Sequence, residues 1–268
     1  MRKLLSELAY RGEVFFSRVQ GIAYDRPARN GEHLLVRRIA PCVRYAIDVG
    51  ANIGDWTAAL LRATKDLAQI TCIEPDPLNA ALLGSRFREQ SVVRVLEAAV
   101  SDRAGDVTFV SGEGKNSGGG YVERGCTHAM VVRAVTLEAV VSDLGDPEVD
   151  LVKCDVEGEE MAVLTGAGQL FQRSRIGVMQ VEYNVTWHRA GRSLRELFEF
   201  ARDHRYHLLL ATPLGFAYLP SYGLGIEDYR MRNIILARED RVPWLSAFGP
   251  VGRARVEHVG QTSISLRV

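Results

Sequence analysis

The segment 45–57 carries the residue types with the clearest chemical meaning in this chain. An apolar run ends in Asp48, and Gly50 and Gly54 follow before an amphipathic helix is expected. This order predicts a strand, a tight loop and a helix whose first backbone amides are open to a ligand. Glu74 ends the next apolar run, where a carboxylate can accept hydrogen bonds from both ribose hydroxyls. The two acids therefore predict a site for a nucleoside-containing cofactor.

The spacing of the loop distinguishes between cofactors. A dinucleotide-binding loop needs clustered glycines so that the pyrophosphate can reach the helix N-terminus, and Asn52 would crowd that approach. The loop therefore favours S-adenosylmethionine. Asp48 is expected to interact with the amino-acid end of this cofactor, directly or through water, and the end of the third strand to line the adenine. The residues predicted to bind the cofactor are Asp48, Gly50, Ala51, Asn52, Gly54, Glu74, Ala99, Val100, Ser101, Asp102 and Asp155.

The elements that would position these residues alternate between strands and helices. Strands are predicted at 45–49, 69–74, 92–98, 149–155, 176–183, 206–211 and 232–238, and helices at 32–39, 54–66, 137–144 and 159–169. Asp76 can cap a further helix that begins at Pro77, and Ser193 with Glu196 forms a capping box for another. The alternation predicts an α/β fold with an open, mostly parallel seven-stranded sheet and helices on both faces.

A second group of motifs concerns the family of the chain. The ordered motifs are D-V-G-A-N-I-G (48–54), E-P (74–75), A-V-S-D (99–102), K-C-D-V-E-G-E-E (153–160) and V-L-T-G-A (163–167). With them the chain resembles FkbM-type methyltransferases over roughly residues 44–238. The resemblance implies a class I, Rossmann-like methyltransferase fold and S-adenosylmethionine as the donor. It also implies a hydroxyl acceptor on a sugar, glycolipid, polyketide or other natural product.

Methyl transfer from a sulfonium to a hydroxyl requires an aligned acceptor, and a general base or a metal ion must take up the proton. Asp155 and Glu157 lie two residues apart at a strand end, so their repulsion would raise one pKa toward neutrality. Alternatively, they form an oxygen site for Mg²⁺ together with Glu182. Glu159 and Glu160 are assigned only to the first turn of the next helix, where acids suit its dipole. The predicted catalytic residues are Asp155, Glu157, Glu182 and His188.

Composition limits the range of partners. The 268 residues carry no formal net charge, and 47% are apolar and 25% charged. These values are typical of a globular protein and lack the basic surplus of a nucleic-acid-binding one. No stretch approaches the ~20 apolar residues of a transmembrane helix. We therefore expect a cytoplasmic protein with a small-molecule partner, no nucleic acid and no transmembrane segment.

Three parts are predicted along the chain. Residues 1–40 form an N-terminal helical extension with a helix at 4–20, 41–240 the methyltransferase domain, and 241–268 a tail that could form a β-hairpin around Gly260. Both extensions are candidates for contacts in a homo-oligomer. The glycine-rich segment 116–121 is either a lid over the acceptor pocket or a plain flexible loop.

The favoured function is S-adenosylmethionine-dependent O-methylation of a small-molecule hydroxyl. Two alternatives stay open. One is a non-catalytic S-adenosylmethionine-binding interaction module whose extensions dock a partner. The other is an NAD-dependent oxidoreductase, which shares the sheet and the ribose-binding acid, although Asn52 speaks against a dinucleotide.

Overall fold

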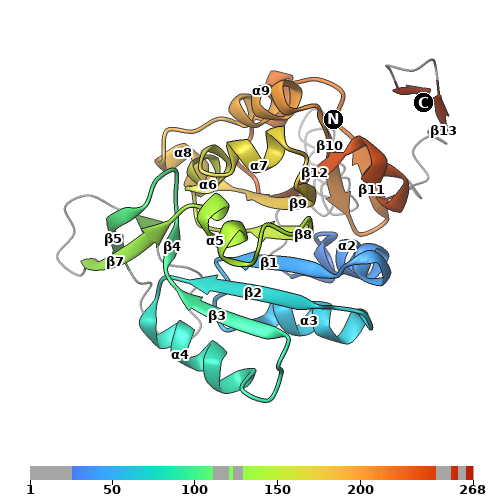
Figure 1. Ribbon diagram of the computed structural model, residues 1–268. Coiled ribbons are helices and arrows are strands. Elements are labelled where there is room, and N and C mark those ends of the chain that lie inside the picture. Colours follow the sequence, from blue (N-terminus) through green and yellow to red (C-terminus); the bar gives the residue numbers. More distant parts are fainter. Residues whose placement is uncertain (1–25, 111–120, 123–128, 246–254, 259–263, 268) are drawn as a thin grey trace, which may run out of the picture.

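The computed structural model describes residues 26–110, 121–122, 129–245, 255–258 and 264–267. Its main sheet has eight strands in the order β11-β10-β12-β9-β8-β1-β2-β3 (Figure 1). The strands are β1 (Tyr45–Val49), β2 (Gln69–Glu74), β3 (Val93–Glu97), β8 (Val149–Cys154), β9 (Ile176–Tyr183), β10 (Tyr206–Thr212), β11 (Gly215–Tyr218) and β12 (Arg232–Arg238). The helix predicted at 4–20 and most of the candidate lid lie outside the described residues.

The sheet confirms the predicted fold class and differs from the prediction in one strand. Neighbouring strands from β9 to β3 pair in parallel, while β12, β10 and β11 add antiparallel pairs. The seven predicted strands are all present, and β11 is an eighth. It is only four residues long and forms a hairpin with β10, too short for a periodic pattern in the sequence.

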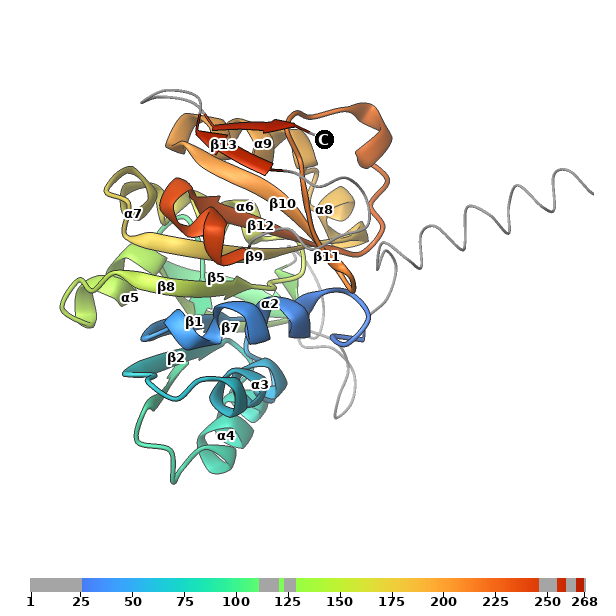
Figure 2. The same ribbon diagram turned by 90° about the vertical axis from the view of Figure 1, so that its right-hand side faces the viewer.

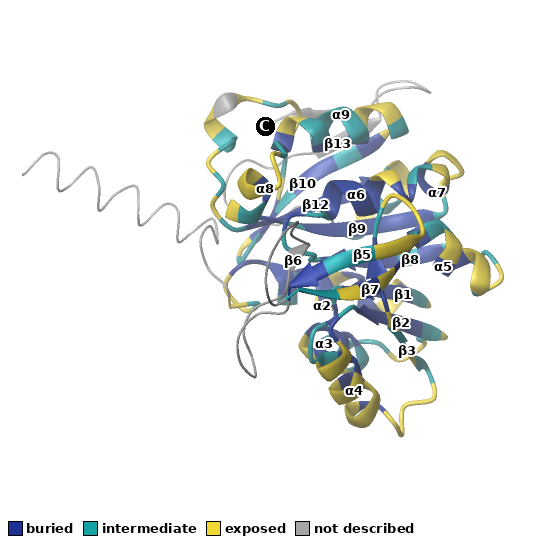
Figure 3. Cartoon of the chain, turned by 90° about the vertical axis from the view of Figure 1, so that its left-hand side faces the viewer, coloured by how far each residue is buried: buried dark blue, intermediate teal, exposed yellow. Residues whose placement is uncertain are grey.

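Helices cover both faces of the sheet, as predicted. They are α2 (Glu32–Ile39), α3 (Asp55–Ala63), α4 (Pro77–Arg86), α5 (Leu137–Asp143), α6 (Glu160–Thr165), α7 (Gly168–Gln172), α8 (Val185–Arg189) and α9 (Leu194–His204). One core joins α5, α6, α7 and α9 to the sheet, and a second joins α2, α3 and α4 to the opposite face. Figure 2 shows α2 beside α3 on that second face. The strands are mostly buried, and exposed residues gather on the outer sides of α4 and α5 (Figure 3).

Local sequence signals explain where several helices begin. The Asp76 carboxylate accepts the backbone N–H groups of Leu78 and Asn79 at the start of α4, and Glu196 accepts the N–H of Ser193 at the start of α9. The helix predicted at 159–169 is divided into α6 and α7. A Cβ at Gly166 would lie 2.2 Å from the Ser101 carbonyl oxygen, so this close backbone contact coincides with the break.

A second sheet lies beside the main one and has the order β4-β7-β5-β6. Its strands are β4 (Ala99–Val100), β5 (Gly105–Val110), β6 (Tyr121–Val122) and β7 (Ala129–Val135). In the tail, β13 (Arg255–His258) and β14 (Ile264–Arg267) pair antiparallel. Among the described residues, no helix is long and apolar enough to cross a membrane.

The loop after β1 is packed directly against the end of β8. Gly50 has a φ of +75°, and a Cβ there would lie 1.8 Å from the Asp155 carbonyl oxygen. The Asp155 N–H also donates to the Val49 carbonyl oxygen at 3.1 Å. The two segments that carry the predicted site residues are therefore held together through their backbones.

This contact predicts that Gly50→Ala lowers the free energy of unfolding by about 2–5 kcal/mol, because the new Cβ adds a clash to an unfavourable φ. Gly84→Ala is the matched control: Gly84 lies in α4, and a methyl group added there would have no neighbouring atom within 4 Å. That change should stabilise the protein by about 0.5–1 kcal/mol. Urea unfolding of both variants measures the difference, and equal stabilities would contradict the close contact.

Candidate active site

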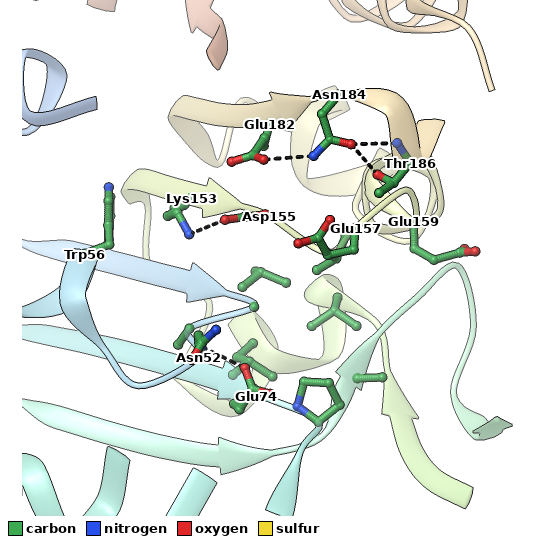
Figure 4. A pocket seen from close by; sticks show the side chains of 18 of the residues that line it. Asn52, Trp56, Glu74, Lys153, Asp155, Glu157, Glu159, Glu182, Asn184 and Thr186 are labelled. Carbon is green, nitrogen blue, oxygen red and sulfur yellow. Dashed lines mark hydrogen bonds and ion pairs between the residues drawn. The ribbon is translucent and has the colours of Figure 1, made fainter. Parts of the chain in front are cut away.

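A cleft of about 1020 Å³ opens at the carboxyl ends of β1, β2, β8 and β9 (Figure 4). The strand order reverses between β1 and β8, and ligands of open α/β sheets bind at such a switch point. Of the predicted site residues, those lining the cleft are Gly50, Ala51, Asn52, Glu74, Ala99, Val100, Asp155, Glu157 and Glu182. Those outside its lining are Asp48, Gly54, Ser101, Asp102 and His188.

Glu74 stands at the carboxyl end of β2 with its carboxylate fixed by two backbone amides. Its Oε2 accepts the N–H of Asn52 at 2.7 Å and its Oε1 the N–H of Asp76 at 3.0 Å. Burial raises the pKa of Glu74 above its usual range. Because a carboxylate has about four acceptor positions, the group can hold this loop and still accept hydrogen bonds from a ligand.

The loop amides differ from the expectation of open donors. Gly50 and Ala51 both donate to the Ile73 carbonyl oxygen, at 2.9 and 3.1 Å, and Gly54 donates to Ala51 at 2.8 Å. With the Asn52 N–H bound to Glu74, these four donors serve to tie the loop to β2 and to itself. The arrangement gives an anion such as pyrophosphate little to bind, which is consistent with the exclusion of a dinucleotide.

A buried ammonium group lies at the acidic end of the cleft. Lys153 on β8 places its Nζ 2.9 Å from Asp155 Oδ2 and 4.0 Å from Asp48 Oδ1. Burial acts to lower the pKa of Lys153, but the carboxylates of Asp155, Asp48 and Glu32 outweigh it and hold this pKa well above its usual range. Lys153 is therefore a permanent cation within the cluster.

Asp48 lies behind the cleft wall instead of facing a ligand. Its side chain is fully buried, and Oδ2 accepts a hydrogen bond from Thr57 Oγ1 at 2.6 Å. Burial raises the pKa of Asp48, and Lys153 is the nearby cation that opposes this shift. In this structure Asp48 therefore interacts with Lys153 and with Thr57 at the start of α3, and not with the cleft.

The turn after β8 directs Glu157 into the cleft. Glu157 has a φ of +55° and Gly158 one of +110°, and a non-glycine residue in this region is commonly a functional position. The carboxylate of Glu160 secures the turn by accepting the N–H groups of Val156 and Gly158, each at 3.0 Å. Glu160 thus does more than the predicted dipole interaction, because it is buried and organises the turn.

Three carboxylates meet on one side of the cleft: Asp155, Glu157 and Glu182 (Figure 4). Burial and then the charge of Asp155 raise the pKa of Glu157 to about 7. The same two causes raise the pKa of Glu182, whose Oε1 accepts a hydrogen bond from Asn184 Nδ2 at 2.9 Å. The predicted repulsion between neighbouring acids is therefore present, and burial adds to it.

His188 is placed away from these acids. It lies on α8, outside the cleft lining, and its ring packs against Tyr229 with centroids 5.0 Å apart. Tyr229 itself lines the cleft. His188 thus touches the site through an aromatic neighbour and stays without direct access to it.

Several lining residues carried no usable signal in the sequence. Pro27, Asn30 and Glu32 enter the cleft from the predicted N-terminal extension, and Trp56, Asn184, Thr186, Tyr229 and Met231 line it as well. Their side chains become neighbours only through the sheet order. Lys153 offered one sequence signal, as one of four lysines in the chain.

The carboxylates do not form a metal site. Within the described ranges, no group of three or more His, Cys, Asp or Glu side chains is arranged to hold a metal ion. Where the Mg²⁺ alternative would place its ion, the Lys153 ammonium already neutralises Asp155. The predicted Mg²⁺ therefore finds no support in the donor set.

Comparison with known proteins identifies the family. Residues 48–208 match the methyltransferase FkbM domain, a stretch that includes Glu74 and the three carboxylates. The chain belongs to the FkbM methyltransferase family. Members are S-adenosylmethionine-dependent enzymes, so the family confirms the sequence resemblance and implies S-adenosylmethionine as the cofactor.

Two curated proteins and one solved structure share this similarity. The 2-O-methyltransferase NoeI of Sinorhizobium fredii is 26% identical over 145 residues, which are 48% of this chain and 59% of that protein. The hexuronic acid methyltransferase AglP of Haloferax volcanii is 28% identical over 139 residues, 52% and 56% of the two chains. The chain thus spans somewhat more than half the length of these relatives.

The crystal structure of methyltransferase FkbM from Methylobacillus flagellatus KT superposes with a TM-score of 0.50 at 18% identity, over 72% of this chain and 43% of that one. This agreement concerns the fold.

The cleft of the present chain fits the cofactor, because Glu74 and an apolar wall that includes Ala99, Val100 and Phe109 lie along it together with Asp155.

Because Asp48, Asp155, Glu32 and Glu182 lie around Lys153, we predict that removing the Lys153 ammonium destabilises the folded protein to an extent that depends on pH. Lys153→Met should lower the free energy of unfolding by about 3–5 kcal/mol near pH 8, because buried carboxylates lose their partner. Burial raises the pKa values of Asp48, Glu32 and Glu182 in the folded state, so these acids take up protons on acidification and the penalty should shrink toward pH 5. Urea unfolding at both pH values measures it, with the exposed Lys65→Met as control. A penalty independent of pH would contradict the electrostatic cause.

Proposed function

We propose that this protein transfers a methyl group from S-adenosylmethionine to a hydroxyl group of a saccharide. The carrying observation is that Glu74 and the carboxylates of Asp155, Glu157 and Glu182 line one cleft at the switch point of the sheet. The names of the two curated relatives support the acceptor class, since one is a 2-O-methyltransferase and the other acts on hexuronic acid.

The residues along the cleft divide into two groups. Glu74 would accept the ribose hydroxyls, and the wall of Ala99, Val100 and Phe109 would contact the adenine. When bound, S-adenosylmethionine supplies an electrophilic methyl group on a sulfonium leaving group. The protein must then position the acceptor oxygen, exclude water and receive one proton.

Glu157 is the proposed general base. Its pKa of about 7 matches the requirement that a general base have a pKa near the operating pH, where a substantial fraction is unprotonated and the base still binds a proton well. Asp155 is paired with Lys153 at 2.9 Å, and its charge raises the proton affinity of Glu157. Asn184 fixes Glu182 through a hydrogen bond, so Glu182 is suited to accept a hydrogen bond from an acceptor hydroxyl.

The charge of the cleft bears on the acceptor. Among the described lining residues, Lys153 is the only lysine, arginine or histidine, and it is already paired with Asp155 and Asp48. Apart from the sulfonium of the donor, a carboxylate on the acceptor would therefore meet further carboxylates and no free protein cation among these lining residues. A neutral saccharide avoids this repulsion, so the proposed acceptor is neutral.

Transfer of a labelled methyl group tests this function. The protein is incubated with labelled S-adenosylmethionine and with matched neutral and uronate glycosides, and the label should appear on a hydroxyl oxygen of the neutral glycosides. Preferred labelling of the uronate would overturn the neutral-acceptor proposal alone. Binding of S-adenosylhomocysteine without transfer to any hydroxylated acceptor would support the interaction module. Binding of NADH but not S-adenosylhomocysteine would support the oxidoreductase.

Glu157 should also give the reaction a characteristic pH profile. Because the base must be unprotonated, kcat/KM should fall about tenfold per pH unit below a pKa near 7. Glu157→Gln should remove this limb and lower kcat by about 10²–10⁴-fold. Glu159→Gln serves as the comparison, since the Glu159 carboxylate points away from this group (Figure 4), and it should keep the limb. A profile unchanged in Glu157→Gln would exclude Glu157 as the base.

A further inference from the structure

The N-terminal segment contributes a wall of the cleft that lies outside the family match. Pro27, Asn30 and Glu32 line the cleft, whereas the match to the FkbM domain begins at residue 48. Glu32 is the first residue of α2, and its N–H donates to Asn30 Oδ1 at 3.1 Å. α2 also packs against α3, which carries Trp56. The fold therefore fixes these residues at the site.

Glu32 is a buried carboxylate, and none of the residues that the structure describes forms an ion pair with it. Its side chain is 6% exposed, and Oε2 accepts a hydrogen bond from Gln180 Nε2 at 3.0 Å. Gln180 in turn donates to Asn233 Oδ1 at 2.9 Å, so the carboxylate is braced by two strands. Burial raises the pKa of Glu32 more than Lys153 and the Gln180 hydrogen bond lower it, so the ionised carboxylate has room for a further positive neighbour. A cationic ligand would supply the missing charge.

Trp56 presents a second uncompensated group along the same cleft. It is 4% exposed and lines the cleft, yet its indole Nε1–H has no hydrogen-bond partner among the described residues. A buried donor without a partner costs about 1–3 kcal/mol, and tryptophan N–H groups in protein interiors usually have one. An acceptor on a ligand would satisfy it.

The strand order indicates which part of a ligand reaches these residues. Glu74 ends β2 on one side of β1, whereas Glu32 is braced from β9 and interacts electrostatically with Lys153 on β8, on the other side. A cofactor whose ribose lies at Glu74 and whose adenine lies toward Ala99 has its remaining end directed across β1 toward β8. In S-adenosylmethionine, that end carries an ammonium and a carboxylate group.

We propose that Glu32 and Trp56 form the subsite for the amino-acid end of the cofactor, with Glu32 accepting hydrogen bonds from the α-ammonium and Trp56 Nε1–H donating to the α-carboxylate. This inference rests on the proposed cofactor function. Through Glu32, it gives the N-terminal segment a part in binding the methyl donor. The amino-acid end of the cofactor would then supply a hydrogen-bond partner to the Trp56 indole N–H and a positive charge to the Glu32 carboxylate.

The test compares ligands that differ at this end. S-adenosylhomocysteine carries both charged groups, decarboxylated S-adenosylhomocysteine carries only the ammonium, and 5′-methylthioadenosine carries neither, and all three are uncharged at sulfur. Titration calorimetry of Glu32→Gln should show about 10- to 100-fold weaker binding of the first two ligands and unchanged binding of 5′-methylthioadenosine. Trp56→Phe should weaken S-adenosylhomocysteine alone.

Two control variants separate the possible outcomes. Glu74→Gln should weaken all three ligands, because the ribose is common to them, and Glu89→Gln, an acid 81% exposed, should weaken none. Equal losses for all ligands in Glu32→Gln would overturn the subsite as a general structural effect, and unchanged affinities would overturn it directly. If the unaltered protein binds none of the three, the proposed function fails and the subsite with it.

Discussion

The buried Lys153 ammonium is the constraint on which the acidic side of the cleft depends. Asp155 and Asp48 lie within 4.0 Å of it, and Glu32 and Glu182 are close enough for its charge to affect their pKa values. Taking these carboxylates out of water without a cation would cost several kcal/mol for each ion. One ammonium cannot neutralise all four carboxylates, and the pKa values of Glu32 and Glu182 are raised by burial. In the proposed reaction the site receives a proton from a hydroxyl, and acids with raised pKa values are suited to that task.

Backbone contacts make this electrostatic arrangement rigid. Gly50 lies against the Asp155 carbonyl, the β1 loop donates to the Ile73 carbonyl, and Glu74 holds Asn52. Glu160 fixes the turn that carries Glu157 through two backbone amides. Each side chain proposed to act on a ligand is therefore supported by a neighbouring element. Groups held in advance in this way need little reorganisation when charge changes at the site.

The sequence predicted those features that depend on local patterns. The bounds of β2, β9, β12 and α2 agree with apolar runs and start signals, and Asp76 caps α4 as its position before Pro77 indicates. Glu74 and Asp155 reach the cleft because acids at the ends of parallel strands share one edge of a sheet. The strand β11 and the division of the helix at Gly166 were not predicted. The first is too short to be periodic, and the second depends on contact with Ser101, 65 positions earlier.

Long-range contacts also explain why the sequence misplaced one site residue and missed others. Asp48 looked like a ligand-facing acid because of its motif, but whether a strand-end side chain faces the cleft or the core depends on what packs beneath it, here Thr57 and Lys153. Glu32 and Met231 come from segments outside the matched stretch 48–208 and still line the cleft. The matched stretch carries Glu74, proposed to bind the ribose, and the carboxylates proposed to accept the proton, while residues such as Glu32 and Met231 complete the walls of the cleft. Ligand binding in this chain can therefore depend on residues that lie outside the matched stretch.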